Sequence, residues 1–101
     1  MKHKPSCRSR LTIIGPARTV ARFAGNEDWE KALNARHIDW LEFTPGHHAC
    51  EFTTSGRPLE KLEKLSRAWR TLIFILQYEC GRSLGLVKAH KGRLDGCELS
   101  Y

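Results

Sequence analysis

The chain has 101 residues, of which 41% are hydrophobic, and this suits one small domain with a single core. Its formal net charge of +6 favours acidic partners such as nucleic acid, an acidic protein surface or a nucleoprotein complex. No segment approaches the ~20 apolar residues of a membrane span, and the run Leu11–Ile14 is too short for a secretory signal. We therefore expect a soluble, cytoplasmic protein with no membrane partner.

Residues 1–10 are polar and basic, and we expect them to form a loose arm. A first strand is predicted over 11–14, where β-branched residues gather before a Gly-Pro break. The proline suits the first turn of a helix, because the N–H that it lacks would have no acceptor there. A short helix over 16–23 would then bury Val20 and Phe23.

A second short helix is predicted over 28–35. Asn26 is a suitable cap, and the acidic residues that follow favour the positive end of the helix dipole. Trp29 and Leu33 are four residues apart and therefore share one face. The exposure of Trp29 stays open at this point, and an exposed tryptophan beside acidic residues would indicate a protein contact.

A hairpin follows, with strands over 37–43 and 49–54 and a Pro-Gly turn between them. Near the turn, His47, His48 and Cys50 form the most metal-like cluster of the chain. Adjacent residues of a strand point to opposite faces, and zinc prefers four ligands at defined spacing. We therefore expect a polar hairpin tip and no metal site.

The main helix is predicted to begin at Pro58. Apolar residues on one stripe predict its buried face, and these are Leu59, Leu62, Leu65 and Trp69. On the other side, Glu60 precedes Lys64 and Glu63 precedes Arg67 at the four-residue spacing that allows ion pairs.

Three strands complete the chain. A near-continuous apolar run predicts a central strand over 71–78, and two further strands are predicted over 83–89 and 94–100. We expect Leu84 and Leu86, with Val87 left open, to face the core, and the last strand to lie at an edge of the sheet.

This order of elements predicts an α+β fold in one domain over 1–101. The first six core elements follow the split βαβ plan of ferredoxin-like domains, and two strands are appended as a β-meander. The expected architecture is a sandwich of an antiparallel sheet with helices on one face.

The four cysteines are far apart in sequence, so no C-x-x-C pair or zinc-finger spacing is present. We expect them to be reduced in the cytosol, and Cys50, Cys80 and Cys97 to be small buried hydrophobes of the strands. Cys80 with a base such as His90 would be a candidate nucleophile, but nothing in the sequence supplies an oxyanion hole. The sequence therefore predicts no enzyme activity and no cofactor.

Basic side chains of the main helix give the strongest binding signal. This set is Arg57, Lys61, Lys64, Arg67 and Arg70. It forms either a solvated face with surface ion pairs or an electrostatic patch for phosphates or carboxylates. We take it as the candidate contact surface, with Trp29 and Arg36 as a second patch.

RNA-binding domains of ferredoxin-like fold stack bases on exposed aromatics of the sheet. Phe74 and Tyr78 share a face of the predicted central strand, but no segment has the aromatic-rich RNP motif. Phe74 is expected in the core, and the position of Tyr78 stays open.

Several segments resemble the YubB-like domain, a ferredoxin-like domain of accessory proteins from plasmids, phages and genomic islands. Residues 10–16 are similar to its opening strand and Gly-Pro turn, and 34–40 lies where the family has a tryptophan-bearing motif. The pattern from Phe52 to Gly81 is similar to its C-terminal half. The chain departs from the family near Ser6, where a tryptophan and an asparagine are usual, and in the Gly-rich motif at 34–37.

The resemblance implies a mobile-element context and supplies no catalytic residues. With a small basic domain, it favours a non-enzymatic inhibitor of a host defence, such as an anti-CRISPR, that binds a host defence protein or nucleoprotein complex. Two alternatives stay open. One is a direct DNA- or RNA-binding protein, whose binding would weaken steeply with salt. The other is a structural homodimer joined through the edge strand over 94–100.

Overall fold

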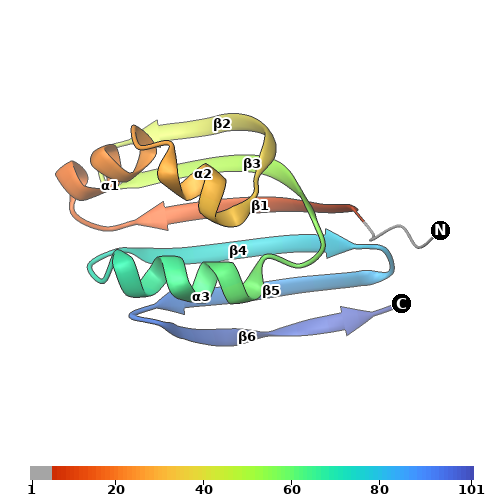
Figure 1. The fold of residues 1–101 in the computed structure, drawn as a ribbon. Helices are drawn as coiled ribbons and strands as arrows, with labels where there is room; N and C mark the ends of the chain where they lie inside the picture. The colour runs from red at the N-terminus through yellow and green to blue at the C-terminus, as the bar shows by residue number, and fades with distance from the viewer. Residues whose placement is uncertain (1–5) are drawn as a thin grey trace.

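The structure is a computed structural model that describes residues 6–101. Six strands form one antiparallel sheet, and three short helices cover one of its faces (Figure 1). The elements in chain order are β1 (Ser6–Ile14), α1 (Ala17–Ala24), α2 (Asp28–Leu33), β2 (Arg36–Thr44), β3 (His47–Ser55), α3 (Leu59–Ala68), β4 (Ile73–Cys80), β5 (Ser83–His90) and β6 (Arg93–Ser100). The predicted α+β fold is confirmed. In this part of the chain, no helix has the length and apolar character needed to cross a membrane.

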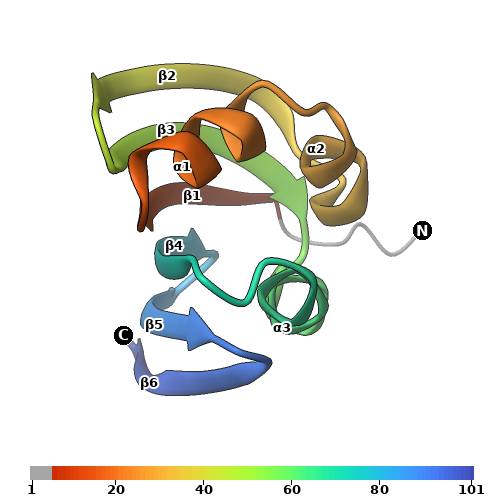
Figure 2. The same cartoon turned by 90° about the vertical axis from the view of Figure 1, so that its left-hand side faces the viewer.

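The strand order in the sheet is β2-β3-β1-β4-β5-β6. β1, the first strand of the sequence, therefore lies inside the sheet and is antiparallel to both β3 and β4. Its register places Leu11 between Cys50 and Leu76. The strands β4, β5 and β6 follow one another as a meander, with β6 at the predicted edge. Figure 2 shows the helices on one side of the sheet, and no other element of residues 6–101 covers the opposite side.

β1 is longer than the sequence predicts. It begins at Ser6, so the predicted loose arm is wrong for residues 6–10. These residues are ordered because both neighbouring strands extend far enough to pair with them, and Cys7 and Ser9 are buried toward the helices. The remainder of the predicted arm, residues 1–5, lies outside the described residues.

An aromatic cluster joins the helices to the sheet. The ring centroid of Phe23 lies 5.5 Å from that of Trp29, 5.2 Å from that of Trp69 and 5.2 Å from that of Phe74. Trp29 also lies 6.0 Å from Phe52 on β3. Large aromatic side chains dominate the energetics of a small core, and this cluster fixes all three helices on one face. The predicted burial of Phe23 is confirmed, and the apolar stripe of α3 faces the core as predicted.

Cys7 and Cys80 lie directly opposite each other on β1 and β4 and form a disulfide. The prediction that these two cysteines are reduced is wrong. They are 73 residues apart in sequence, but antiparallel pairing places their Cα atoms 4.4 Å apart, which is within the range of disulfides. Cys80 is buried as predicted, and Cys7 is buried beside it.

The other two cysteines are free thiols. Cys50 is buried, and burial raises the pKa of its thiol to about 12, with the charge of Glu30 adding to the rise. Cys97 is exposed, so its predicted burial is wrong. The reason is that β6 is an edge strand that directs Cys97 to the face without helices, opposite Leu86 of β5.

β5 turns its leucines away from the helices. Leu84 and Leu86 are 45% and 48% exposed, so their predicted inward orientation is wrong, whereas Val87 is buried. The cause is the pairing of Gly85 with Tyr78. The Tyr78 ring occupies the space that a side chain at position 85 would need, so Gly85 faces the helix side. A strand alternates strictly, and its leucines then lie on the other face.

Candidate functional site

The structure separates the predicted contact residues of α3 into engaged and free side chains. Arg57 precedes the helix and reaches across to β5 and β6, where its Nε donates to a carboxylate oxygen of Glu98. Its Nη2 donates to Ser83 Oγ at 3.0 Å. Arg67 Nη2 donates to Glu63 Oε1 at 2.6 Å, which confirms the predicted ion pair. Both guanidinium groups are therefore engaged in contacts within the chain.

Lys61, Lys64 and Arg70 are the free part of this surface, and we call them the α3 basic strip. All three are exposed, and none belongs to an ion pair within residues 6–101. Glu60 and Lys64, which have the spacing of a pair, are likewise not bridged in that range. The strip therefore offers positive charge that no carboxylate of the described chain neutralises.

The second predicted patch does not form. Trp29 is only 2% exposed, so its role as a contact residue is wrong. The reason is that α2 directs this ring into the aromatic cluster with Phe23 and Phe52 rather than to solvent. Arg36 is exposed at the start of β2, where its Nη2 donates to Ser55 Oγ at 2.9 Å.

Arg57, Glu98 and Tyr78 form a polar network that the sequence did not predict. Tyr78 Oη donates to the same Glu98 oxygen at 2.9 Å. The hydrogen bonds from Arg57 and Tyr78 lower the pKa of the Glu98 carboxyl, whereas burial raises the pKa of Tyr78. The network ties the edge strand β6 to the segment before α3. No short-range pattern could have joined position 57 to position 98, because the tertiary fold brings the segment before α3 to β6.

This network predicts an acid-sensitive contribution to stability. The pKa of Glu98 is lowered in the folded state from an ordinary value of 4.5, so the contribution is fully present above that value. It is lost as the pH falls through the folded-state pKa. Urea unfolding at a series of pH values should therefore show a shallower acid loss for Glu98→Gln than for the wild type. Glu60→Gln, an exposed control, should follow the wild type, and equal slopes for all three would contradict the network.

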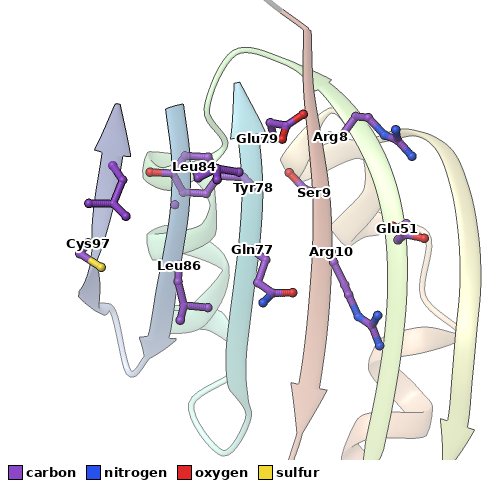
Figure 3. Close-up of a pocket in the computed structure, with 12 residues that line it drawn as sticks. Arg8, Ser9, Arg10, Glu51, Gln77, Tyr78, Glu79, Leu84, Leu86 and Cys97 are labelled. Atoms are coloured by element: carbon purple, nitrogen blue, oxygen red, sulfur yellow. The ribbon is translucent and has the colours of Figure 1, made fainter. Parts of the chain in front are cut away.

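The face of the sheet without helices carries a hollow of about 650 Å³ (Figure 3). Its lining comes from β1, β3, β4, β5 and β6, and consists of Arg8, Ser9, Arg10, Glu51, Gln77, Tyr78, Glu79, Leu84, Gly85, Leu86, Cys97 and Leu99. Sequence reasoning missed it because the leucines were assigned to the core. One side is apolar, with Leu99 68% exposed beside Leu84 and Leu86.

The other side of the hollow carries charges of both signs. Arg8 lies opposite Glu79, and Arg10 lies opposite Glu51. Arg10 has a long contact of 3.6 Å with Glu42, but Arg8, Glu51 and Glu79 have no ion pair within residues 6–101. The hollow is therefore amphipathic and locally balanced in charge.

The aromatic residues of the central strands do not form a platform for bases. Phe74 is fully buried and Tyr78 is 4% exposed, so both belong to the core beneath the helices. Phe52 is buried on the same face. Base stacking on a sheet requires exposed rings, and the ring of Tyr78, the one aromatic residue of the lining, is buried.

The histidine cluster at the hairpin also separates. His47 Nδ1 lies 3.2 Å from Glu42 Oε2, whereas the His48 ring packs against Trp40 and Phe43 at 6.0 Å and 5.1 Å. The two histidines therefore have different surroundings, and Cys50 is buried. Within residues 6–101, no group of three His, Cys, Asp or Glu side chains is arranged to hold a metal ion.

No model of a protein family matches this chain, and no curated protein matches it. Among solved structures, the chain is similar to the crystal structure of the protein Api92 from Yersinia pseudotuberculosis, assigned to family DUF1281. The TM-score is 0.54 at 15% sequence identity, over 74% of this chain and 30% of that chain. The chain thus spans less than a third of the length of Api92. This likeness supports the α+β fold and carries no evidence on activity.

Proposed function

We propose that this protein is a non-enzymatic accessory protein of a mobile genetic element. It inhibits a host defence, in the manner of an anti-CRISPR, by docking on a host nucleoprotein complex. The observation that carries the proposal is the α3 basic strip of Lys61, Lys64 and Arg70, whose charges lack carboxylate partners in the described chain. Free lysine and arginine groups attract acidic protein surfaces and phosphates, and they speed the encounter with such partners.

The fold and its context support this proposal. We describe the domain as ferredoxin-like, because β3 lies between β1 and β2, and β1 lies between β3 and β4, as in a split βαβ plan. The mobile-element context rests on the resemblance of residues 10–16 and 52–81 to the YubB-like domain.

A host complex of this kind places the protein in the cytoplasm, where disulfides are uncommon. The Cys7–Cys80 bond is compatible with this location because the two residues are only 0% and 4% exposed. Thiol exchange requires access of the attacking thiolate to sulfur, so burial slows reduction.

We rank docking on a protein of the complex above direct binding of free nucleic acid. Phe52, Phe74 and Tyr78 are buried, so β3 and β4 offer no exposed ring for stacked bases, and the exposed Phe43 lies on the edge strand β2. Direct binding remains the second candidate, because the α3 basic strip would also attract phosphates.

Affinity capture from a host lysate tests the proposal. Tagged wild type should retain a specific partner after nuclease treatment, and the double variant Lys61→Glu with Lys64→Glu should retain about tenfold less. A matched control reverses two exposed bases outside α3, Arg82→Glu with Lys88→Glu, and should capture as wild type does.

Each other result has a definite meaning. Nuclease-sensitive recovery would replace the proposal with direct nucleic-acid binding. Unchanged capture by the α3 double variant would reject the strip as the contact surface, and the absence of any specific partner would reject the inhibitor.

A further inference from the structure

The uncovered sheet face leaves a group of apolar side chains in solvent. Leu84, Leu86 and Leu99 are 45%, 48% and 68% exposed on adjacent strands, and Cys97 is exposed among them. Scattered exposed leucines are ordinary, but a contiguous apolar patch beside polar residues is typical of an interface. The hollow that these residues line is therefore a candidate contact surface.

The register of the sheet arranges the lining in two neighbouring rows. The first row runs across the strands as Arg8, Glu79, Leu84 and Leu99. The second runs as Glu51, Arg10, Gln77, Leu86 and Cys97. Both rows carry an arginine on β1, a leucine on β5 and an apolar residue on β6. Each row also has one glutamate, but on opposite sides of β1.

The charge of the hollow indicates what kind of surface would fit it. Its charged lining consists of Arg8, Arg10, Glu51 and Glu79, which is neutral, although the chain carries a net charge of +6. A strongly acidic partner would repel the two glutamates, and a strongly basic partner would repel the two arginines. A surface with the same leucines and the same balanced charges satisfies both halves of the hollow, and this chain itself has such a surface.

We infer that the occupant is a second copy of this chain, packed face to face about a two-fold axis that runs across the strands between the two rows. This axis places Leu84 over Leu86 of the second copy and brings Leu99 to its Cys97. It also places Arg8 over Arg10 of the second copy. Each of these two arginines then lies beside a glutamate of the other copy, Arg8 beside Glu51 and Arg10 beside Glu79, so the four side chains form a neutral cluster. Sheets pack about 10 Å apart, a gap that an arginine and a glutamate span when each extends toward the other.

Face-to-face pairing differs from pairing through the edge strand β6. It buries residues of β1 and β5 that an edge contact would leave in solvent. It also leaves the α3 basic strip free on both copies, because the helices lie on the opposite side of the sheet (Figure 2). The inference is therefore independent of the proposed function, and the two can fail separately.

Charge reversal with mixing gives a sharp test. The wild type should be dimeric by sedimentation equilibrium. Arg8→Glu alone brings the new carboxylate beside Glu51 of the second copy, and Glu51→Arg alone brings the new guanidinium group beside its Arg8. Each variant should therefore raise the dissociation constant of the dimer about tenfold or more. An equimolar mixture of the two variants restores both ion pairs and should form a heterodimer of near wild-type affinity.

The apolar half is tested with a matched pair of leucine variants. Leu86→Lys should dissociate the dimer, whereas Leu41→Lys, at an exposed leucine of β2 outside the hollow, should not. Circular dichroism confirms that each variant is folded. A monomeric wild type would overturn the inference, as would a dimer that tolerates Leu86→Lys and both charge reversals. A dimer that tolerates these changes would point to β6 instead.

Discussion

Replacement of Trp29 by alanine is expected to lower the free energy of unfolding by about 3–5 kcal/mol. The side chain is 2% exposed, and its ring centroid lies 5.5 Å from Phe23, 5.8 Å from Trp40 and 6.0 Å from Phe52. Truncation would open a cavity between α2 and the sheet, and the neighbouring rings could fill this cavity only in part. The loss is a large share of the stability of a domain of this size.

Urea unfolding followed by far-ultraviolet circular dichroism measures this effect. Trp29→Phe should cost less than the alanine variant, because it keeps an aromatic ring in the cluster. The indole Nε1 also has no hydrogen-bond partner within residues 6–101, so phenylalanine sacrifices volume alone. Lys31→Ala, at an exposed position of the same helix, should be close to neutral. If Trp29→Ala lowered the free energy of unfolding only slightly, Trp29 would not be buried in the core, and it would again be a candidate contact residue.

Reduction of the Cys7–Cys80 bond is expected to lower the free energy of unfolding by about 2–4 kcal/mol. The bond joins residues 73 apart in sequence, so it restricts a large part of the unfolded chain. Both residues are buried in the core, and the reduced thiols would still pack as small hydrophobes. The loss therefore comes mainly from the greater freedom of the unfolded state.

The measurement compares urea unfolding with and without a phosphine reductant. The double variant Cys7→Val with Cys80→Val should resemble the reduced wild type and should not respond to reductant. Cys97→Ser should respond as fully as the wild type, because Cys97 takes no part in the bond. Identical midpoints for the wild type in both conditions would show that the bond does not form in solution.

The sequence predicted the elements whose pattern is local. The period of α3 placed Leu62 and Leu65 in the core, and the spacing in α1 placed Val20 and Phe23 there. The ion pair of Glu63 with Arg67 was also predicted, since both residues lie on one helix four positions apart.

The features that were not predicted depend on the register between paired strands. In β5, apolar residues occupy both faces, so the sequence could not decide between Leu86 and Val87. The pairing of Gly85 with Tyr78 decides it. The hollow follows from that choice, because the leucines of β5 then point to the bare side of the sheet.

Trp29 and Cys7 show the same limit. A helix of six residues with acidic neighbours gives no decisive pattern of burial, so the environment of Trp29 depends on the rings of Phe23 and Phe52 around it. The disulfide partner of Cys7 could not be predicted from the spacing of the cysteines in the sequence, because the bond depends on the pairing of β1 with β4.

The inner position of β1 has a consequence for biosynthesis. This strand leaves the ribosome before its two neighbours, β3 and β4. Contacts that span so much of the chain slow folding, because loop-closure entropy must be overcome before they form. Cys50, on the strand that will become the other neighbour of β1, emerges before Cys80 and can meet Cys7 before β4 is made. The order of translation thus offers a non-native thiol partner before the native one.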